Sequence, residues 1–235
     1  MWRKITKAWR DPIGVVKRRI SPHWQLYKYR APDGYQHTLY WTDRLGKYGF
    51  DLRGVGFYDL SHEENREIYG RAKRTFIDLC CEQEITFKNV SIVDIGCGTG
   101  FYARTFFENG GTEYLGIDVT DILFPRLRQE FPQFEFRKLD ISTHELAGRF
   151  DLIIMIDVTQ HITNDDKFHF AMQNVKLSLT RNGVFIVTSW LADKIPCSFY
   201  EVGRPMIAYK REFPGYAFRD PIPFRDKFIF TIRQK

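Results

Sequence analysis

A glycine-rich loop is the strongest chemical signal in the sequence. Gly96, Gly98 and Gly100 follow a short apolar run, residues 90–95, in which Asp94 is the one acidic residue. Glycine lets the backbone turn tightly and lets a ligand approach without a Cβ in the way. In open α/β sheets, nucleotide-type ligands bind at the carboxyl ends of the strands. The loop therefore predicts such a site directly after the apolar run.

Three further acidic residues, Asp118, Asp140 and Asp157, each follow an apolar run later in the chain. A carboxylate at the end of the strand after the glycine loop can accept two hydrogen bonds from ribose hydroxyls. A carboxylate at the end of the next strand can accept one from an adenine amino group. Aspartate also commonly caps helices that follow strands, so a single residue of this kind would carry little weight. Their ordered succession predicts a site for a cofactor that contains adenosine.

These residues need a scaffold in which strands and helices alternate. Apolar runs predict strands at residues 90–95, 114–117, 134–139, 150–156, 183–189 and 227–232. Helical patterns begin at Ser61, where Glu64 has the capping-box spacing, and cover residues 101–108, 121–131 and 164–179. Residues 32–60 are predicted to be loop-rich with short helical pieces. The alternation predicts a mainly parallel sheet covered on both faces.

The loop and the strand ends together resemble the motifs of the class I S-adenosylmethionine-dependent methyltransferases. The similar stretches are residues 93–100, 115–118, 139–141, 150–162 and 179–187. The resemblance implies an α/β fold with a Rossmann-like seven-stranded mixed sheet, the last strand antiparallel, and an N-terminal helical cap. The implied division is a basic, aromatic-rich segment or cap at residues 1–60 and a methyltransferase domain at residues 61–235.

The resemblance implies S-adenosylmethionine as the cofactor and assigns the glycine loop to it. Gly96, Gly98 and Gly100 would pass beneath the methionine part of the cofactor, and Asp94 would orient its amino group directly or through water. A dinucleotide fits less well, because the glycines are spaced GxGxG rather than GxGxxG and Phe101 follows directly.

The resemblance also assigns the strand ends. Asp118 would bind the ribose hydroxyls, and Asp140 with Ile141 would hold the adenine. Asp157 would contact the cofactor or the methyl acceptor. The four cysteines include no CxxC pair, and no Cys/His run has the spacing of zinc ligands. We therefore expect a site without a metal ion.

His161 is the candidate general base. In the family, the loop after the fourth strand faces the methyl group, and His161 lies in that loop. A sulfonium methyl is already a strong electrophile, so the enzyme contributes proximity, alignment and, for a hydroxyl acceptor, a base. The alternative is that His161 caps the following helix or only shapes the pocket. The sequence marks His37 as an ordinary surface or loop residue.

The methyl acceptor is the least determined part of the prediction. No Asn-Pro-Pro-Tyr-type run follows the fourth strand, and the run found there is more like those of small-molecule and sugar methyltransferases. We expect transfer to O or N of a small molecule or saccharide, such as a sugar nucleotide or glycan. Arg204, Arg219 and Arg225 would pair with a phosphate or carboxylate on the acceptor, or form surface salt bridges. The alternatives are an RNA or protein methyltransferase that uses a basic N-terminal arm, and a non-catalytic cofactor-binding protein.

Positive charge is concentrated at the N-terminus. Residues 1–31 hold nine Lys or Arg and one Asp, whereas the whole chain has a net charge of +6. The rest of the chain is nearly neutral, which argues against a nucleic-acid partner. Trp and Ile at helical spacing among these bases favour a helix packed on the body or a lid, with peripheral membrane contact as the alternative. The chain shows neither a signal sequence nor an apolar run of ~18 residues, so we expect a cytoplasmic protein; the oligomeric state does not follow from the sequence.

Overall fold

The structure is a computed structural model that describes residues 27–192 and 196–235. Most of the basic segment to which a lid or membrane contact was assigned therefore lies outside the described residues. Within the described ranges, no helix is long and apolar enough to cross a membrane. Among the same residues, no three His, Cys, Asp or Glu side chains are grouped so that they could hold a metal ion.

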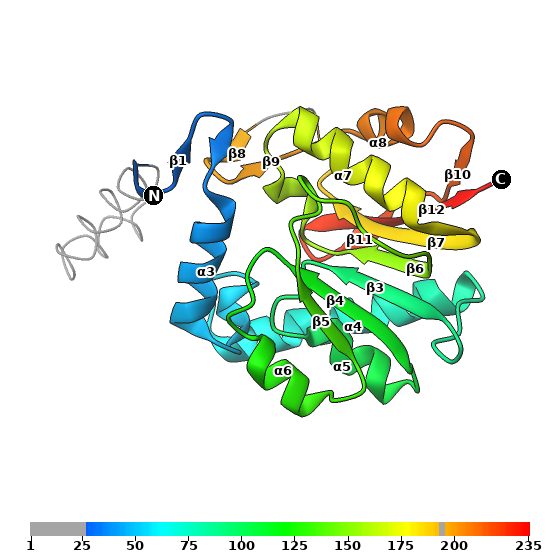
Figure 1. The fold of residues 1–235 in the computed structure, drawn as a ribbon, viewed down its shortest axis with the longest axis horizontal. Helices are drawn as coiled ribbons and strands as arrows, with labels where there is room; N and C mark the ends of the chain where they lie inside the picture. Colours follow the sequence, from blue (N-terminus) through cyan, green and yellow to red (C-terminus); the bar gives the residue numbers. More distant parts are fainter. Residues whose placement is uncertain (1–26, 193–195) are drawn as a thin grey trace, which may run out of the picture.

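One large sheet runs through the middle of the molecule (Figure 1). Its strands are β3 (Ser91–Ile95), β4 (Glu113–Asp118), β5 (Glu135–Lys138), β6 (Phe150–Met155), β7 (Leu179–Ser189), β10 (Tyr216–Phe218), β11 (Ile222–Phe224) and β12 (Lys227–Gln234). Their order is β10-β12-β7-β6-β3-β4-β5, with β11 also paired to β12. Strands β3 to β7 are parallel, and β12 is antiparallel to β7. The predicted Rossmann-like sheet with an antiparallel last strand is confirmed, and β11 adds an eighth strand to the seven expected.

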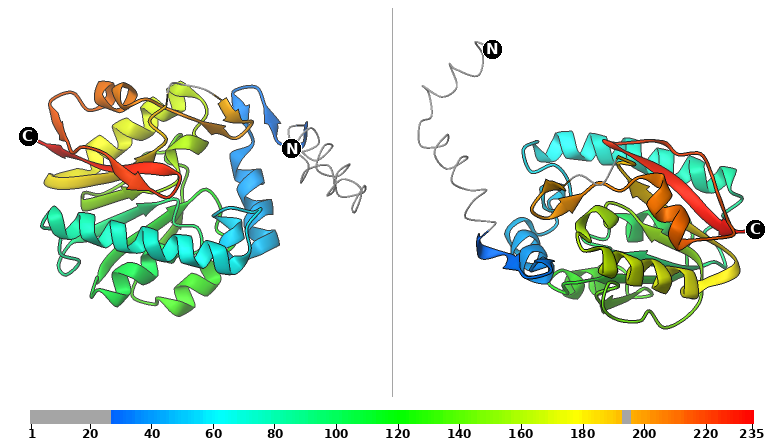
Figure 2. Two further views of the ribbon diagram at one scale, coloured as in Figure 1. Left: turned by 180° about the vertical axis from the view of Figure 1, so that it is seen from behind. Right: turned by 90° about the horizontal axis from the view of Figure 1, so that it is seen from above.

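Helices cover both faces of this sheet (Figure 2). The first face carries α4 (His62–Glu82), α5 (Phe101–Glu108) and α6 (Phe124–Glu130), and the second carries α7 (Asp165–Ser178) and α8 (Met206–Glu212). Successive strand residues point to opposite faces. In β6, Ile154 packs in the first apolar layer and Ile153 in the second. Because both faces are buried, the central strands are continuous apolar runs.

Element boundaries follow local chemistry. α4 begins at the predicted capping box, in which Ser61 Oγ accepts from the Glu64 N–H at 3.2 Å and Glu64 Oε2 accepts from the Ser61 N–H at 2.7 Å. α6 begins at Phe124 rather than at residue 121, with proline in its first turn. β7 begins at Leu179 rather than at residue 183, because Leu179 already pairs with β6 before an irregularity in the ladder.

Residues 32–60 are more regular than predicted. A hairpin of β1 (Arg30–Ala31) and β2 (Gly34–Tyr35) leads into the twelve-residue helix α3 (His37–Tyr48) and a 3₁₀ turn, Leu52–Gly54. The start of α3 has no sequence signal, because Gln36 makes no side-chain capping bond and the first turn holds no acidic residue. In Figure 1, α3 stands beside the carboxyl ends of the parallel strands.

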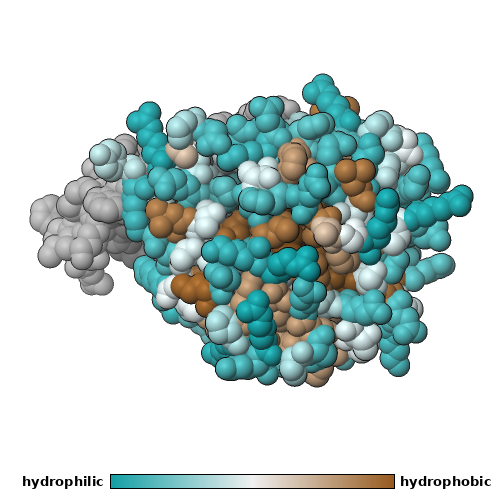
Figure 3. All heavy atoms as spheres, viewed as in Figure 1, coloured by the Kyte–Doolittle hydropathy of each residue, from teal (hydrophilic) through white to brown (hydrophobic). Residues whose placement is uncertain are grey.

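A second hairpin, β8 (Pro196–Ser198) and β9 (Glu201–Val202), was also not predicted. It lies beside the N-terminal hairpin, where aromatic side chains from both segments form one cluster: Tyr29, Tyr35, Tyr40, Trp41, Phe199 and Tyr200. On the face drawn in Figure 3, hydrophobic residues gather in a central band and the surrounding surface is hydrophilic. The two added hairpins thus extend the sheet scaffold on the side where the strands end.

Candidate active site

The glycine loop turns under the carboxyl end of β3. The N–H groups of Gly96 and Cys97 both donate to the carbonyl oxygen of Ile117, at 2.8 and 3.0 Å, which ties the loop to β4. Gly96 has a φ of +78°, in the left-handed region that favours glycine. A Cβ at this position would lie 2.4 Å from Cγ2 of Val158. The loop therefore needs glycine here for both its conformation and its space.

Gly96→Ala is expected to lower the free energy of unfolding by about 2–4 kcal/mol, because it combines a positive φ with overpacking against a stiff β-branched side chain. Gly70→Ala is the matched control, since Gly70 lies in α4 and an added Cβ would meet no atom within 4 Å. The control should be neutral or stabilising by up to about 1 kcal/mol, as for glycine replaced in a helix. Urea denaturation measures both values, and equal stability of the two variants would contradict this view of the loop.

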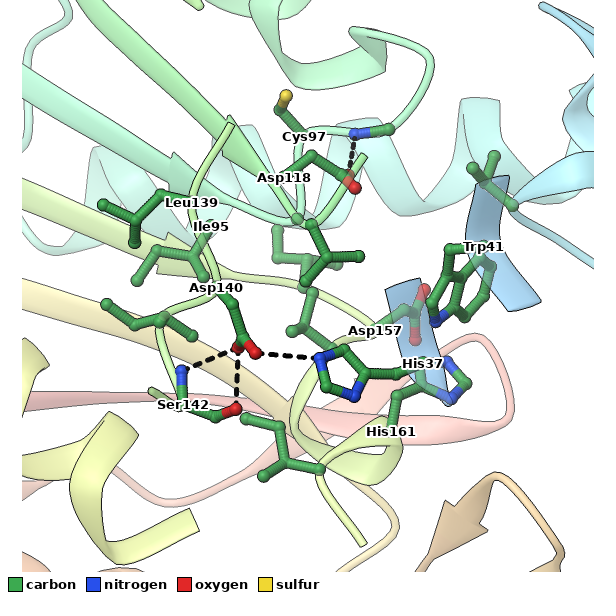
Figure 4. A pocket seen from close by; sticks show the side chains of 18 of the residues that line it. His37, Trp41, Ile95, Cys97, Asp118, Leu139, Asp140, Ser142, Asp157 and His161 are labelled. Carbon is green, nitrogen blue, oxygen red and sulfur yellow. Dashed lines mark hydrogen bonds and ion pairs between the residues drawn. The ribbon is translucent and has the colours of Figure 1, made fainter. Parts of the chain in front are cut away.

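Asp118 closes β4 directly beside the glycine loop (Figure 4). One carboxylate oxygen accepts from the Gly98 N–H at 3.0 Å, and the other accepts from the Thr120 N–H at 3.2 Å. Burial raises the pKa of Asp118 to about 6, although these N–H groups oppose the shift. A carboxylate has about four accepting lone pairs, so accepting capacity remains for a ligand in the cavity that Asp118 lines.

Asp94 lies behind the loop and is not part of that cavity wall. It is 2% exposed and accepts a hydrogen bond from the hydroxyl of Tyr114 at 2.7 Å. Burial raises the pKa of Asp94 to about 7, against the effect of this hydrogen bond. The structure thus gives Asp94 a supporting place under the loop, and a contact with a ligand amino group stays a prediction.

Asp140 follows β5 and is bound by two residues of different segments. Its Oδ1 accepts from the N–H and Oγ–H of Ser142 at 2.9 and 2.7 Å, and its Oδ2 lies 2.8 Å from His37 Nε2 of α3. Burial opposes ionisation, but these hydrogen bonds hold the pKa of Asp140 well below its usual range. Ile141 lines the same cavity. The interpretation of His37 as an ordinary surface residue was wrong, because α3 brings it onto the cavity wall.

Asp157 has a φ of +59° at the turn after β6, which is uncommon for a non-glycine residue. Its carboxylate forms ion pairs with Arg225, at close range, and with Lys227 at 3.2 Å. Burial opposes ionisation, but the positive charge of Arg225 lowers the pKa of Asp157. The carboxylate is therefore ionised and held by the C-terminal strands.

The three arginines singled out in the sequence all have partners within the protein. Arg225 pairs with Asp157, and Arg219 forms an ion pair with Glu82. Arg204 is 3% exposed and donates to the carbonyl oxygens of Thr159 at 3.1 Å and Ile162 at 2.6 Å. The expectation that these guanidinium groups wait for an acceptor phosphate or carboxylate is not met for Arg204 and Arg219, which brace the fold.

His161 ends a 3₁₀ turn, Thr159–His161, that follows β6. Its Nδ1 lies 3.1 Å from the carbonyl oxygen of Tyr200. Because a carbonyl can only accept, Nδ1 carries the proton and Nε2 keeps its lone pair. The ring stacks on Tyr200 and meets the edge of Trp41, at centroid distances of 5.5 and 4.8 Å. The alternative that His161 caps the next helix was wrong, since Asn164 caps α7.

Burial sets the protonation state of this imidazole. Burial, helped by the positive charges of Lys227 and Arg44, lowers the pKa of His161 to about 3. The side chain is therefore neutral near physiological pH. Its Nε2 lies 3.3 Å from the side-chain nitrogen of Gln160, a weak contact that leaves the lone pair accessible to a stronger donor. A neutral imidazole held in this tautomer accepts a hydrogen bond at Nε2. With a pKa of about 3 it is a weak base in the empty site, so it takes a proton from a ligand only where the bound ligand raises that pKa.

Two cavities meet at His161. The first, about 1150 Å³ including the open space at its mouth, is lined by the glycine loop, Asp118 and Asp140. The second, about 1760 Å³ on the same measure, is lined by aromatic and charged residues of the N-terminal segment and the C-terminal strands. Trp41, Val55, Asp157 and His161 line both. A nucleotide-type ligand in the first cavity and a second molecule in the second cavity would therefore meet at the neutral side chain of His161.

Trp41 and His37 are site residues that sequence reasoning missed. Both lie on α3, whose start has no capping signal, so no periodic pattern marked them. The available signal was the density of aromatic residues between positions 35 and 58.

Comparison with known proteins shows what the central part of the chain and the fold are similar to. Residues 93–185, which hold the glycine loop and most of the parallel strands, match the family model of a methyltransferase domain. The S-adenosylmethionine-dependent methyltransferase from Clostridium acetobutylicum ATCC 824 has the same fold, with a TM-score of 0.61, 15% identity, and coverage of 80% of this chain and 98% of that chain. Residues 93–185 therefore match a methyltransferase domain, and the fold around them is one that S-adenosylmethionine-dependent methyltransferases have.

Curated relatives are similar to this chain over its central part. (S)-Coclaurine N-methyltransferase from Thalictrum flavum subsp. glaucum is 25% identical over 149 residues, or 59% of this chain and 38% of the relative. The dTDP-3-amino-3,6-dideoxy-alpha-D-glucopyranose N,N-dimethyltransferase from Streptomyces fradiae is 23% identical over 134 residues, or 57% and 51% of the two chains. This chain thus spans about half or less of these relatives' lengths. N-methyltransferase NodS from Bradyrhizobium japonicum WM9, solved with S-adenosyl-L-homocysteine, shares the fold with a TM-score of 0.56 and 17% identity, covering 69% of this chain and 87% of that chain.

Proposed function

We propose that this protein is a methyltransferase that transfers a methyl group from S-adenosylmethionine to a nitrogen or oxygen atom of a small molecule or saccharide. The observation that carries the proposal is the meeting of two cavities at His161, one with a glycine cradle and strand-end carboxylates and the other with aromatic and charged walls. The match of residues 93–185 to a methyltransferase domain and the N-methyltransferases among the relatives support the same reaction class.

The residues of the first cavity fit an adenosine-type cofactor. A Cβ would fill the cradle at Gly96, as the 2.4 Å approach to Val158 shows. The free lone pairs of Asp118 would accept from the ribose hydroxyls, and Asp140 with Ile141 would hold the adenine ring. When bound, S-adenosylmethionine supplies a methyl group on a positively charged sulfur. The first 60 residues would act as the cap of the 61–235 domain, since the described part of this segment places His37 and Trp41 on the cavity wall.

His161 would take the acceptor proton. Its Nε2 has the lone pair, and the hydrogen bond from Nδ1 to Tyr200 fixes the ring in that orientation. Trp41 packs against the same ring and would keep water from the boundary between the cavities. Asp157, ionised between Arg225 and Lys227, would stabilise the imidazolium formed when His161 accepts the proton.

A nitrogen acceptor is favoured by Glu201. This carboxylate lines the second cavity, is partly buried and accepts from the Ser198 hydroxyl at 3.0 Å. It belongs to β9, directly after Tyr200, whose carbonyl receives the His161 hydrogen bond. A protonated amine would pair with Glu201. It would lose a proton to His161 before attack on the methyl group once the bound acceptor, together with Asp157, has raised the pKa of His161 from its low value in the empty site.

The acceptor class is tested by a screen with S-adenosylmethionine labelled in its methyl group. Amines, amino sugars and sugar nucleotides are each offered beside the alcohol of the same skeleton. Label in the amine but not in the matched alcohol supports N-methylation, and the reverse supports O-methylation. Tight binding of S-adenosylhomocysteine without transfer to any acceptor would favour a non-catalytic binding protein.

Cofactor affinity should depend on pH through Asp118. Burial gives the free carboxyl a pKa of about 6, whereas ribose hydroxyls donate to the ionised form and would lower that pKa. Below about pH 6, cofactor binding therefore releases a proton from Asp118. The affinity for the cofactor decreases as the pH falls through about 6, by up to tenfold per pH unit. Calorimetry with S-adenosylhomocysteine between about pH 5 and 8 measures this slope. A flat profile in the wild type would contradict the role of Asp118.

A further inference from the structure

The cationic groups of the second cavity differ in how their charge is balanced. Arg225 and Lys227 form ion pairs with Asp157, and Lys227 also pairs with Asp226 at 2.9 Å. Arg71 is exposed to solvent, which screens its charge. Arg44, on α3, is the exception, because its guanidinium is partly buried and forms no ion pair with any carboxylate in the described residues.

Every polar partner of Arg44 is a neutral oxygen. Nη1 donates to the Tyr40 hydroxyl at 2.9 Å, and Nη2 donates to the carbonyl oxygens of Gly56 at 2.9 Å and Arg53 at 3.3 Å. Its buried Nε has no hydrogen-bond partner. The rings of Tyr40, Trp41 and Tyr58 lie 5.3–6.0 Å from the guanidinium carbon and offset part of the desolvation of the charge. Buried charges in proteins are normally paired, but no residue of the described ranges supplies a counter-charge for Arg44.

Arg44 is close to the predicted reaction point. It lines the second cavity, and its guanidinium carbon lies 5.3 Å from the ring centroid of Trp41. The Trp41 ring in turn lies 4.8 Å from the ring of His161, centroid to centroid. One indole therefore separates the guanidinium from the base. Glu201 lines the same cavity and forms no ion pair with Arg44, which leaves the two opposite charges free to bind different groups of one ligand.

We propose that Arg44 binds an anionic group, a phosphate or a carboxylate, on the methyl acceptor, so that this group anchors the acceptor while the atom to be methylated lies at His161. The guanidinium fork matches the oxygens of both anions, and a charge-assisted hydrogen bond is stronger than one to a neutral oxygen. The proposal rests on the proposed function, because it takes the second cavity to be the acceptor site. With Glu201 in the same cavity, the acceptor would carry both an anion and an amine.

The test measures anion binding to the full chain saturated with S-adenosylhomocysteine. Inorganic phosphate and acetate are titrated separately by NMR into the wild type, Arg44→Gln, Arg44→Lys and the control Arg66→Gln. Arg66 is exposed, pairs with Glu63 at 3.4 Å and lies outside both cavities, so its variant removes the same charge elsewhere. Phosphate, acetate or both should bind the wild type and the control equally. Binding should weaken about tenfold in Arg44→Gln and less in Arg44→Lys, which keeps the charge but loses the fork.

The preference between the two anions identifies phosphate or carboxylate as the acceptor group. Equal anion affinity in wild type and Arg44→Gln, or no binding of either anion to the wild type, would overturn the proposal. If Arg44→Gln does not fold, the wild type alone still decides, because a bound anion must shift the Arg44 Nε–Hε signal and an unmoved signal refutes the site. Binding of S-adenosylhomocysteine is recorded first, so failure of the cofactor site is distinguished from failure of the anion site.

Discussion

Replacing His161 with Asn is expected to slow methyl transfer by about 100-fold or more near neutral pH, the scale of general-base catalysis. The new amide can still donate to the carbonyl oxygen of Tyr200, which Nδ1 contacts at 3.1 Å, but it has no basic nitrogen in place of Nε2. The turn and the stacked rings are therefore kept while the base is removed. Initial rates with methyl-labelled cofactor and the acceptor found by the screen measure the loss. Calorimetry with S-adenosylhomocysteine should give an affinity within about threefold of the wild type.

The pH dependence of the methyl-transfer rate distinguishes a general-base role of His161 from a role in shaping the pocket. The pKa of His161 is lowered to about 3 by burial, so the wild-type rate should not fall between about pH 8 and 5 through protonation of this ring. For an amine acceptor, the defect of His161→Asn should shrink as the pH approaches the amine pKa, because the free amine needs no base. His144→Asn is the control, since His144 is exposed and contacts Thr143. A wild-type rate for His161→Asn would show that the histidine only shapes the pocket.

Asp118→Asn is expected to weaken binding of S-adenosylhomocysteine by about 100-fold or more. Its two carboxylate oxygens accept from the N–H groups of Gly98 and Thr120, and its free lone pairs would accept from the ribose. An amide has one accepting oxygen and turns its own N–H groups toward one of these donors. The glycine loop and the ribose site are therefore disturbed together, and calorimetry measures the combined loss.

The control for this variant is Asp121→Asn. Asp121 is exposed at the same end of the sheet and pairs with Lys138 at 3.3 Å. Its variant should bind S-adenosylhomocysteine as the wild type does, because a surface ion pair contributes little. Thermal denaturation shows whether Asp118→Asn is folded. A folded Asp118→Asn with wild-type affinity would contradict the assignment of this carboxylate.

The scaffold was predictable where burial and local chemistry agree. The run at residues 150–156 is apolar because β6 is buried on both faces, and the structure gives the strand as Phe150–Met155. α5 occupies Phe101–Glu108, as predicted, because Gly100 takes a φ of +73° just before it. The capping box at Ser61 likewise fixed the start of α4. In each case the determining interaction lies within a few residues of the boundary.

The cap was not predictable, because its determinants are distant in sequence. α3 has no capping signal and is held by contacts such as Thr42 Oγ1 with Thr120 Oγ1 at 2.9 Å. His37 reaches Asp140 across 103 positions of the chain. No local sequence pattern predicts a contact between residues so far apart, so His37 was predicted to be an ordinary surface or loop residue.

The candidate site divides in the same way. The strand ends at Asp118, Asp140 and Asp157 converge because the carboxyl ends of parallel strands share one edge of the sheet, and all three line the first cavity. The role of an arginine depends instead on its partners in space. Arg204 was predicted to bind the acceptor but donates to backbone carbonyl oxygens. Arg44 was not predicted as a site residue, yet its guanidinium has no carboxylate partner among the described residues and its Nε has no hydrogen-bond partner.

The central claim is that the first cavity binds an adenosine-type sulfonium cofactor rather than a dinucleotide. Calorimetric titration of the purified chain with S-adenosylmethionine and, separately, with NAD tests it most directly. We expect S-adenosylmethionine to bind at micromolar concentrations and NAD to show no measurable binding. Binding of NAD alone would contradict the account and would turn the search toward hydride transfer.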